Sequence, residues 1–213
     1  MKLFGYWRSS ASYRVRIALA LKNIDYEYEP VNLLAGEQKS DAHLARNPLA
    51  LVPALKTDEG AVLTQSLAIL EYLEETRPDP SLLPHGAAPR ANARAIALTL
   101  ASEAQPFMNL RIQQYLKSEG GFDDEVMKQW LNTWPGGAMA AVEKMLARTA
   151  GDYSIGDTPG LADCFLIPQM FAANRFGVDV SGFAKMNEIY ERCQKHPAFE
   201  KAHPDNQPDA VKG

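Results

Sequence analysis

The residues with the clearest chemistry lie at the predicted start of the first helix. Arg8, Ser9, Ser10 and Ser12 follow a strand-like segment, KLFGYW, and precede an apolar stripe. The first turn of a helix has amides without partners and a partial positive charge, and both favour an anion. Such helix ends also lower the pKa of a thiol, whose ionised form is the nucleophile. This turn is therefore predicted to bind an anionic group, although a single serine would suffice to cap the helix.

A second predicted helix, SLAILEYLEETR, begins with a similar arrangement. Gln65 precedes it and Ser66 is its first residue and plausible N-cap. A carboxylate placed there would be held by the free amides, the helix dipole and the serine hydroxyl together. Capping and ligand binding are compatible roles for Ser66.

Further polar residues lie in the second half of the chain. Gln105 and Asn109 are four residues apart among apolar neighbours, so they share one face of a predicted helix over 90–118 and need a polar partner. Arg111 is a further candidate for a substrate contact, although it falls on the opposite side of a regular helix, where a solvated arginine or an ion-pair partner is expected. Cys164 and Cys193 lack the spacing of a metal site or disulfide framework and are predicted to be inert core residues.

Composition narrows the class of protein. The 213 residues carry a net charge of −4, which gives no basic field for nucleic acid or an anionic membrane. No apolar run approaches the roughly 18 residues that span a bilayer, and the N-terminus shows no leader pattern. We therefore expect a cytoplasmic, metal-free protein in which local groups hold any anionic ligand.

The elements that position these residues fall into two parts. Residues 1–80 predict an α/β domain of order β-α-β-α-β-β-α, with a helix over Ser12–Lys22, a parallel first strand pair and a hairpin around Asp58-Glu59-Gly60. Residues 81–89 lie in a proline-rich linker, and 90–213 predict an all-helical domain. Its long helices are expected over 90–118 and 123–149, the second split at Pro135-Gly136-Gly137. LADCFLIPQMFAANRF predicts a buried helix, and one or two further helices end the chain.

This order of elements resembles the thioredoxin-like half of glutathione transferases. RSSASYRVRIAL resembles the zeta-class signature, while NPLALVPAL and QSLAILEYLEE are similar to the family's Asn-Pro…Val-Pro and Gln-Ser elements. Three later segments resemble zeta-class segments of the second domain: GDTPGLADCFLIPQ, RFGVDV and HPDNQPD. The similarity covers essentially the whole chain and implies the glutathione transferase fold, glutathione as cofactor and a homodimer.

The resemblance also implies roles for individual residues toward glutathione. Ser10 first, and Ser9 second, would contact the thiolate, with Ser12 a plain cap. The Val52 backbone would pair with the cysteinyl part beside a cis-Pro53. Gln65 and Ser66 would hold the γ-glutamyl carboxylate.

The same resemblance suggests how a diacid substrate is bound. Arg8 lies beside the proposed sulfur site, and Arg175 matches the family's substrate arginine; arginine binds carboxylates bidentately. Both are therefore catalytic and substrate-binding candidates. Gln105 and Asn109 would contact glutathione or substrate.

Zeta-class proteins of this kind are maleylacetoacetate isomerases, with maleylpyruvate isomerases close by. The resemblance implies reversible addition of the glutathione thiolate to a cis double bond, rotation, and release of the trans product with glutathione regenerated. A general glutathione transferase acting on α-halo acids or peroxides is the alternative enzyme, and a non-catalytic binding protein is the alternative of another class. The residues do not distinguish between the two keto-diacids.

The sequence departs from the zeta-class pattern at three positions. Ala11 replaces the signature cysteine and Tyr13 its tryptophan, so a mechanism that needs that cysteine is excluded. Gly160 replaces a threonine N-cap, and Asp163 remains as the other arm of a capping box.

Overall fold

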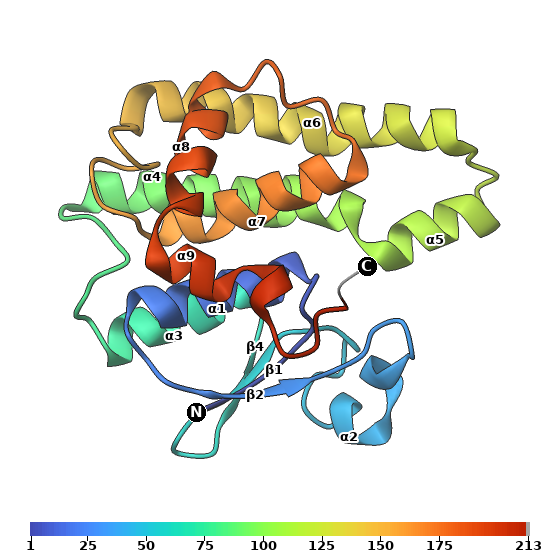
Figure 1. The fold of residues 1–213 in the computed structure, drawn as a ribbon, viewed down its shortest axis with the longest axis horizontal. Coiled ribbons are helices and arrows are strands. Elements are labelled where there is room, and N and C mark those ends of the chain that lie inside the picture. Colours follow the sequence, from blue (N-terminus) through green and yellow to red (C-terminus); the bar gives the residue numbers. More distant parts are fainter. Residues whose placement is uncertain (212–213) are drawn as a thin grey trace. The chain divides into compact units, whose positions relative to one another are not determined.

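The computed structural model describes residues 1–211, which form two compact units (Figure 1). The first comprises Met1–Leu82 together with the chain from Lys195 onward, and the second comprises Leu83–Gln194. No helix within residues 1–211 combines the length and apolar character needed to cross a membrane.

The first unit is built on a four-stranded mixed sheet. Its elements are β1 (Lys2–Gly5), α1 (Ser10–Leu21), β2 (Glu27–Pro30), a 3₁₀ turn (Glu37–Lys39), α2 (Asp41–Leu44), β3 (Ala54–Lys56), β4 (Val62–Thr64) and α3 (Ser66–Thr76). The strand order is β2-β1-β3-β4, with β1 parallel to β2 and the other pairs antiparallel. The predicted order, the parallel pair and the hairpin are confirmed. Helices α1 and α3 lie side by side on one face of the sheet (Figure 1).

The strand register brings three separate connections to one edge of the sheet. Phe4 of β1 pairs with Ala54 of β3, and Ala54 pairs with Thr64 of β4. Because both pairings are antiparallel, the residues after β1, before β3 and after β4 leave the sheet at the same edge. The turn into α1, the segment at Val52 and the start of α3 therefore meet there.

Helix α1 begins two residues earlier than the sequence predicted, and its cap is a different serine. Ser9 has an extended backbone, and its Oγ accepts a hydrogen bond from the Ser12 amide at 3.2 Å. Ser12 lies inside the helix, is fully buried, and accepts a hydrogen bond from the Tyr6 amide at 3.3 Å. The prediction that Ser12 is a plain cap is therefore wrong, since a cap lies just outside the helical backbone.

Two cations of α1 and the lysine at its C-cap are buried rather than solvated: Arg14, Arg16 and Lys22. Lys22 forms an ion pair of 2.7 Å with Glu74 and donates to the carbonyls of Arg77 and Pro80 at 2.7 and 2.9 Å. Glu74 also accepts from the Leu82 amide at 2.9 Å. This network fixes the proline-rich segment to the ends of α1 and α3.

The Glu74 network should make stability depend on pH in the acid range. Burial alone would raise the pKa of Glu74, but hydrogen bonds from Leu82, Lys22 and Ser81 lower it below its ordinary value of 4.5. A carboxylate with a depressed folded-state pKa stabilises above about pH 4.5 and loses that contribution as pH falls through the folded value. Replacing Glu74 with Gln should cost about 1–3 kcal/mol at pH 7. The melting temperature of this variant should also fall less steeply than that of the wild type as the pH is lowered below about 4.5. An equal fall of the melting temperature in both proteins would contradict the assignment.

The end of the chain packs on the α/β unit. Helix α9 (Pro197–Ala202) packs against α1, burying Phe199 and Ala202, and a 3₁₀ turn (Pro204–Asn206) follows. The sequence-based boundary placed residues 90–213 together in the helical domain, whereas the contacts group the segment from Lys195 with Met1–Leu82. Periodicity identified the helix but not the unit on which its apolar face packs.

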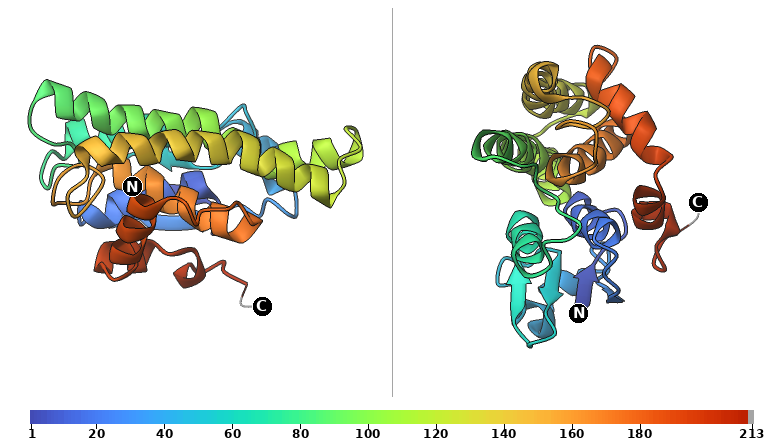
Figure 2. Two further views of the ribbon diagram at one scale, coloured as in Figure 1. Left: turned by 90° about the horizontal axis from the view of Figure 1, so that it is seen from above. Right: turned by 90° about the vertical axis from the view of Figure 1, so that its left-hand side faces the viewer.

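The second unit is helical throughout its described elements. These are α4 (Ala87–Leu98), a π-helical segment (Thr99–Ala104), a 3₁₀ turn (Gln105–Met108), α5 (Leu110–Ser118), α6 (Asp124–Thr149), α7 (Leu161–Phe176) and α8 (Ala184–Gln194). Helices α4 and α6 run alongside each other (Figure 2). As predicted, α7 is a buried helix, with every residue from Leu161 to Met170 buried. The last predicted helical segment is two helices, α8 and α9.

Two predicted helices of this unit differ from the structure, both at a proline. The helix expected over 90–118 is interrupted, because Pro106 lies in a 3₁₀ turn and Asn109 is extended. The break expected at Pro135-Gly136-Gly137 does not occur, and α6 is continuous. Six of its buried residues form one stripe that runs through the proline: Met127, Leu131, Pro135, Met139, Val142 and Leu146. Packing of this stripe outweighs the hydrogen bond that Pro135 cannot donate.

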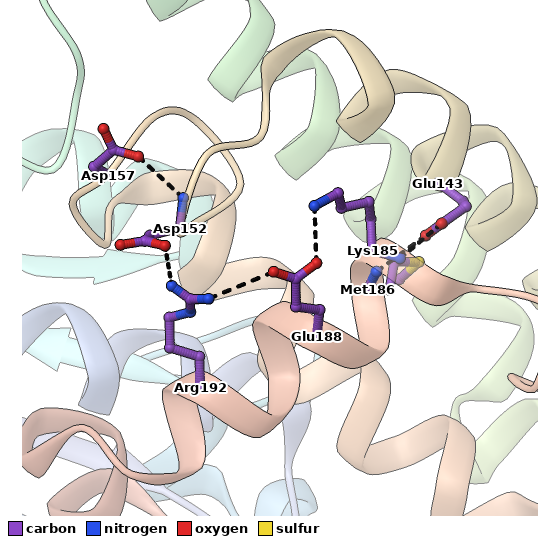
Figure 3. A network of polar contacts seen from close by, with 7 residues as sticks. All are labelled: Glu143, Asp152, Asp157, Lys185, Met186, Glu188 and Arg192. Atoms are coloured by element: carbon purple, nitrogen blue, oxygen red, sulfur yellow. Dashed lines mark hydrogen bonds and ion pairs between the residues drawn. The ribbon is translucent and has the colours of Figure 1, made fainter.

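A polar network ties α8 to its neighbours in the second unit (Figure 3). The Glu143 carboxylate of α6 accepts from the amides of Lys185 and Met186 at 2.8 and 3.0 Å, and so caps the first turn of α8. Further along α8, Arg192 pairs with Glu188 and with Asp152 of the loop after α6. These contacts fix the first turn of α8 to α6 and its last turn to the loop after α6.

Candidate active site

The turn from β1 into α1 presents the predicted sulfur-binding groups. Ser10 is the first residue of α1 and half-buried, and its hydroxyl makes no hydrogen bond to any residue within 1–211. The Ser9 hydroxyl accepts from Ser12 but keeps its own proton to donate. The first turn of α1 contains no acidic residue that would oppose an anion. Both serines are therefore able to donate to a negatively charged group.

Arg8 precedes these serines and is exposed. Its guanidinium carbon lies 4.1 Å from the centroid of the Trp7 ring. A cation over an aromatic face is held electrostatically. This contact restricts the directions in which Arg8 can extend, while its donors stay accessible.

The start of α3 is an uncapped helix end supported by a buried cation. Gln65 occupies the N-cap position without a side-chain cap bond, and Ser66 is the first helical residue rather than the cap. Ser66 Oγ accepts from Arg14 Nη1 at 3.3 Å. Burial lowers the pKa of Arg14 to about 9, so the guanidinium stays charged at neutral pH. The free amides, the Ser66 hydroxyl and the Arg14 charge together favour a carboxylate.

The backbone of Gln65 supports the same interpretation. Its φ of +67° lies in the left-handed region, which costs a non-glycine residue about 1–3 kcal/mol. Such strain concentrates at ligand sites, where the surrounding structure enforces it. At Gln65 it turns the chain from β4 directly into α3.

Val52 lies at the same sheet edge, next to a cis peptide bond to Pro53. The cis isomer that the resemblance implied is thus present. Neither the amide nor the carbonyl of Val52 makes a hydrogen bond to a residue that the structure describes. Val52 is buried, and buried backbone groups need hydrogen-bond partners, which an extended ligand could supply here.

Two residues that the sequence reasoning missed hold the segment before Val52. The Leu51 carbonyl accepts from Asn47 Nδ2 at 2.8 Å and from His43 Nε2 at 2.9 Å, so the imidazole carries a proton on Nε2. Asn47 Oδ1 also accepts from the Leu49 amide at 3.1 Å. Asn47 lies in the NPLALVPAL element quoted above, so the sequence offered a signal for its role. No motif in the sequence pointed to His43.

Replacing Asn47 with Ala should therefore loosen the Val52 backbone. We expect the dissociation constant for glutathione to rise about three- to tenfold, since one buried hydrogen bond is worth about 1 kcal/mol. Isothermal titration calorimetry measures this directly. As a control, Asn32→Ala removes an asparagine that bonds only its own exposed turn. Equal affinities for the Asn47 variant and the control would refute this role.

The groups at this edge fit a tripeptide thiol. An uncapped helix end with a buried cation suits the α-carboxylate of a γ-glutamyl group, and the unpaired backbone of Val52 suits an extended peptide. The Ser10 hydroxyl and the amides at the start of α1 suit a thiolate. All belong to the first unit and to one edge of its sheet. In glutathione the γ-glutamyl residue carries the α-carboxylate, and the cysteinyl residue next to it carries both the peptide backbone and the thiol.

The candidate residues of the second unit are arranged differently from the prediction. Gln105 lies in a 3₁₀ turn, and Asn109 is the extended N-cap of α5, with its Oδ1 accepting from the Arg111 amide at 3.2 Å. The two therefore do not share the face of a regular helix, and that argument is wrong. Arg111 is exposed in the first turn of α5.

Arg175 lies in the last turn of α7 and is exposed. Its guanidinium carbon is 4.7 Å from the centroid of the Phe176 ring, and α7 ends at Gly177 with φ +72°. At the other end of α7, Asp163 Oδ2 accepts from the Gly160 amide at 2.9 Å. The predicted capping arm is confirmed and fixes where α7 begins.

Both cysteines are fully buried and free, as predicted, and burial raises the pKa of Cys193. With Ala11 beside the serines, no reactive thiol is exposed. Treatment of the protein with N-ethylmaleimide, followed by gel filtration and fresh glutathione, should leave more than about 90% of the activity, because buried neutral thiols react slowly. The Ala11→Cys variant provides the sensitive control. Rapid inactivation of the wild type would show that a protein thiol is essential.

Comparisons with known proteins give a consistent result. Residues 1–75 match the family model "Glutathione S-transferase, N-terminal domain". The maleylacetoacetate isomerase of Pseudomonas aeruginosa is 46% identical over 211 residues, covering 98% of each chain. Two solved structures align over nearly the entire chain. A holo maleylpyruvate isomerase, described as a bacterial zeta-class glutathione transferase, has a TM-score of 0.94 at 43% identity, covering 99% of this chain and 100% of its own. A maleylacetoacetate isomerase from Methylobacterium extorquens with bound malonate and glutathione has a TM-score of 0.93 at 38% identity, covering 100% of both.

Proposed function

Because the chain belongs to the zeta-class glutathione transferase family of maleylacetoacetate and maleylpyruvate isomerases, we propose that it is a glutathione-dependent cis–trans isomerase. Its substrate is maleylacetoacetate or maleylpyruvate, and its product is the fumaryl isomer. The observation that carries this proposal is the meeting of three groups at one sheet edge: the uncapped start of α3 with Arg14, the unpaired backbone of Val52, and the Ser10 hydroxyl. The glutathione and malonate bound to the Methylobacterium extorquens relative are consistent with it.

In the proposed site, the residues of the first unit hold the cofactor. Gln65 and Ser66 bind the γ-glutamyl carboxylate, with Arg14 behind the serine, and the Val52 backbone, next to Pro53, pairs with the cysteinyl group. Ser10, supported by Ser9 and the first-turn amides of α1, stabilises the ionised sulfur. When bound, glutathione supplies the nucleophilic thiol that the protein itself does not expose.

The substrate carries two acidic groups, and we assign their recognition to Arg8 and Arg175. Arginine binds a carboxylate with two parallel hydrogen bonds, which fix orientation as well as charge. Holding the acidic ends leaves the central bond free to rotate once its order is reduced, and the cations stabilise the enolate charge that develops. Gln105 and Asn109 are further candidates for contacts to glutathione or substrate, and Arg111 is a further candidate for a contact to the substrate.

The test is turnover with glutathione below the substrate concentration. Maleylacetoacetate and maleylpyruvate are supplied separately, and the substrate absorbance band and free thiol are followed together. We expect many turnovers per glutathione with the thiol undiminished. Stoichiometric loss of thiol would identify a transferase, and absence of both reaction and glutathione binding would identify a binding protein. The faster of the two substrates identifies the preferred keto-diacid.

We further propose a cytoplasmic homodimer that binds no nucleic acid. The family resemblance supports the dimer, and the net charge of −4 argues against a nucleic-acid partner. Sedimentation equilibrium should give twice the chain mass of 23.5 kDa.

A further inference from the structure

The turn that carries Arg8, Ser9 and Ser10 is fixed partly by bonds of its own. The Tyr6 amide donates to Ser12 Oγ at 3.3 Å, and the Ser9 amide donates to the Tyr6 carbonyl at 3.0 Å. These bonds lie within the turn and the first turns of α1. Neither bond involves the amide or the carbonyl of Trp7, which lies in the middle of the turn.

The amide of Trp7 bonds to the C-terminal segment directly, and its carbonyl is linked to that segment through Arg16. Its amide donates to Asp209 Oδ2 at 3.0 Å, across 202 residues of sequence. Its carbonyl accepts from Arg16 Nη2 at 3.0 Å, and the same guanidinium donates from Nε to the Ala202 carbonyl at 3.0 Å. The segment from Lys195 thus reaches the β1–α1 turn both directly and through a buried arginine.

The Asp209 carboxylate is itself held in place. The oxygen that accepts from Trp7 also accepts from the Tyr28 hydroxyl of β2 at 3.2 Å. Burial raises the pKa of Tyr28, so the phenol keeps its proton and donates. Trp7 is only 4% exposed, and water therefore does not readily replace a lost partner of its amide.

We propose that Asp209 is a positioning residue for the sulfur-binding turn, acting through the Trp7 amide to aim the groups that follow it. The proposal rests on the function proposed above. Arg8 and the two serines begin at the next residue, and donors stabilise a thiolate only when they are held within about 0.5 Å of the productive geometry. Loss of Asp209 leaves a buried amide unsatisfied and releases the turn at its centre. The donors then average over more positions, and the thiolate loses stabilisation.

The test compares Asp209→Ala with Gln207→Ala. Gln207 lies in the same segment, but its side chain bonds only the carbonyls of Lys201 and His203, so its loss perturbs the segment without touching the turn. The pKa of bound glutathione is followed by its ultraviolet thiolate band, and affinity by calorimetry. In Asp209→Ala that pKa should rise by about half a unit or more, since an anion's pKa follows the donors aimed at it. In Gln207→Ala it should match the wild type even if the melting temperature falls.

Two further variants keep the test decisive. Asp209→Asn retains an oxygen that can accept from Trp7 and should restore most of the wild-type pKa. If Asp209→Ala does not fold, Asp209→Ser, which is polar but too short to reach the amide, takes its place with the same expected rise. An unchanged pKa in the Ala or Ser variant, or an equal shift in Gln207→Ala, would overturn the positioning role while leaving the proposed function intact. A wild-type pKa equal to that of free glutathione would overturn the proposed function, and this inference with it.

Discussion

Replacing Arg175 with Ala should lower kcat/KM for the diacid substrate about 100-fold while changing glutathione affinity less than about threefold. The expected size is that of a charge-assisted bidentate pair, about 2–3 kcal/mol. Arg175 lies in the last turn of α7, whereas the groups proposed to hold the γ-glutamyl carboxylate, the cysteinyl backbone and the thiolate of glutathione belong to the first unit. Most of the loss should appear in KM, because the carboxylate clamp is present in both the ground state and the transition state, and the part due to enolate stabilisation should appear in kcat.

Two matched variants sharpen this measurement. Arg175→Lys keeps the charge but loses the planar fork, and should recover only part of the activity. Arg148→Ala removes an exposed arginine from the last turn of α6 and should behave as wild type. Equal weakening of glutathione and substrate binding in Arg175→Ala would refute the assigned role.

Replacing Ser10 with Ala should raise the pKa of bound glutathione by about one to two units, toward the value of a free thiol. At neutral pH, the ionised fraction and the rate would then fall about 10- to 100-fold, since each unit is a factor of ten. The Ser10 hydroxyl makes no hydrogen bond within residues 1–211, so protein stability should hardly change. The pH dependence of kcat/KM and the thiolate band give the same pKa by independent routes.

Ser9→Ala separates the two serines. Ser9 caps α1 through the Ser12 amide, so its loss should lower the free energy of unfolding by about 1 kcal/mol. Its effect on the bound thiol should be smaller than that of Ser10→Ala. A larger pKa rise for Ser9→Ala would reverse the order proposed for the two hydroxyls, and an unchanged pH profile in both would remove them from the site.

The sequence pattern of short segments predicted those elements of the fold that depend on interactions within short segments. The alternating strands, the hairpin at Gly60 and the apolar stripe of α1 were visible in the sequence because side-chain period and turn chemistry are properties of short segments. The helix-end argument placed Ser9, Ser10 and Ser66 correctly at the starts of α1 and α3. Their roles toward glutathione remain predictions that the experiments above test.

The remaining features depend on packing and on distant partners. Pro106 and Pro135 carry the same local signal, yet one lies where regular helix ends and the other lies inside a continuous helix. The buried stripe of α6 continues beyond Pro135 to Leu146, whereas α5, the helix after Pro106, buries none of its residues. The burial of Arg14 beside Ser66 required α1 and α3 to be placed together. The bond from Trp7 to Asp209 joins opposite ends of the chain, and no local pattern announces it.

Titration of glutathione bound to the wild-type protein tests the central claim most directly. The thiolate absorbance is followed against pH at saturating protein, with free glutathione in the same buffers. The uncharged donors and helix amides at the start of α1 predict a bound pKa at least about one unit below the free-thiol value of roughly 8.5. A bound value equal to or above that of free glutathione would contradict the account.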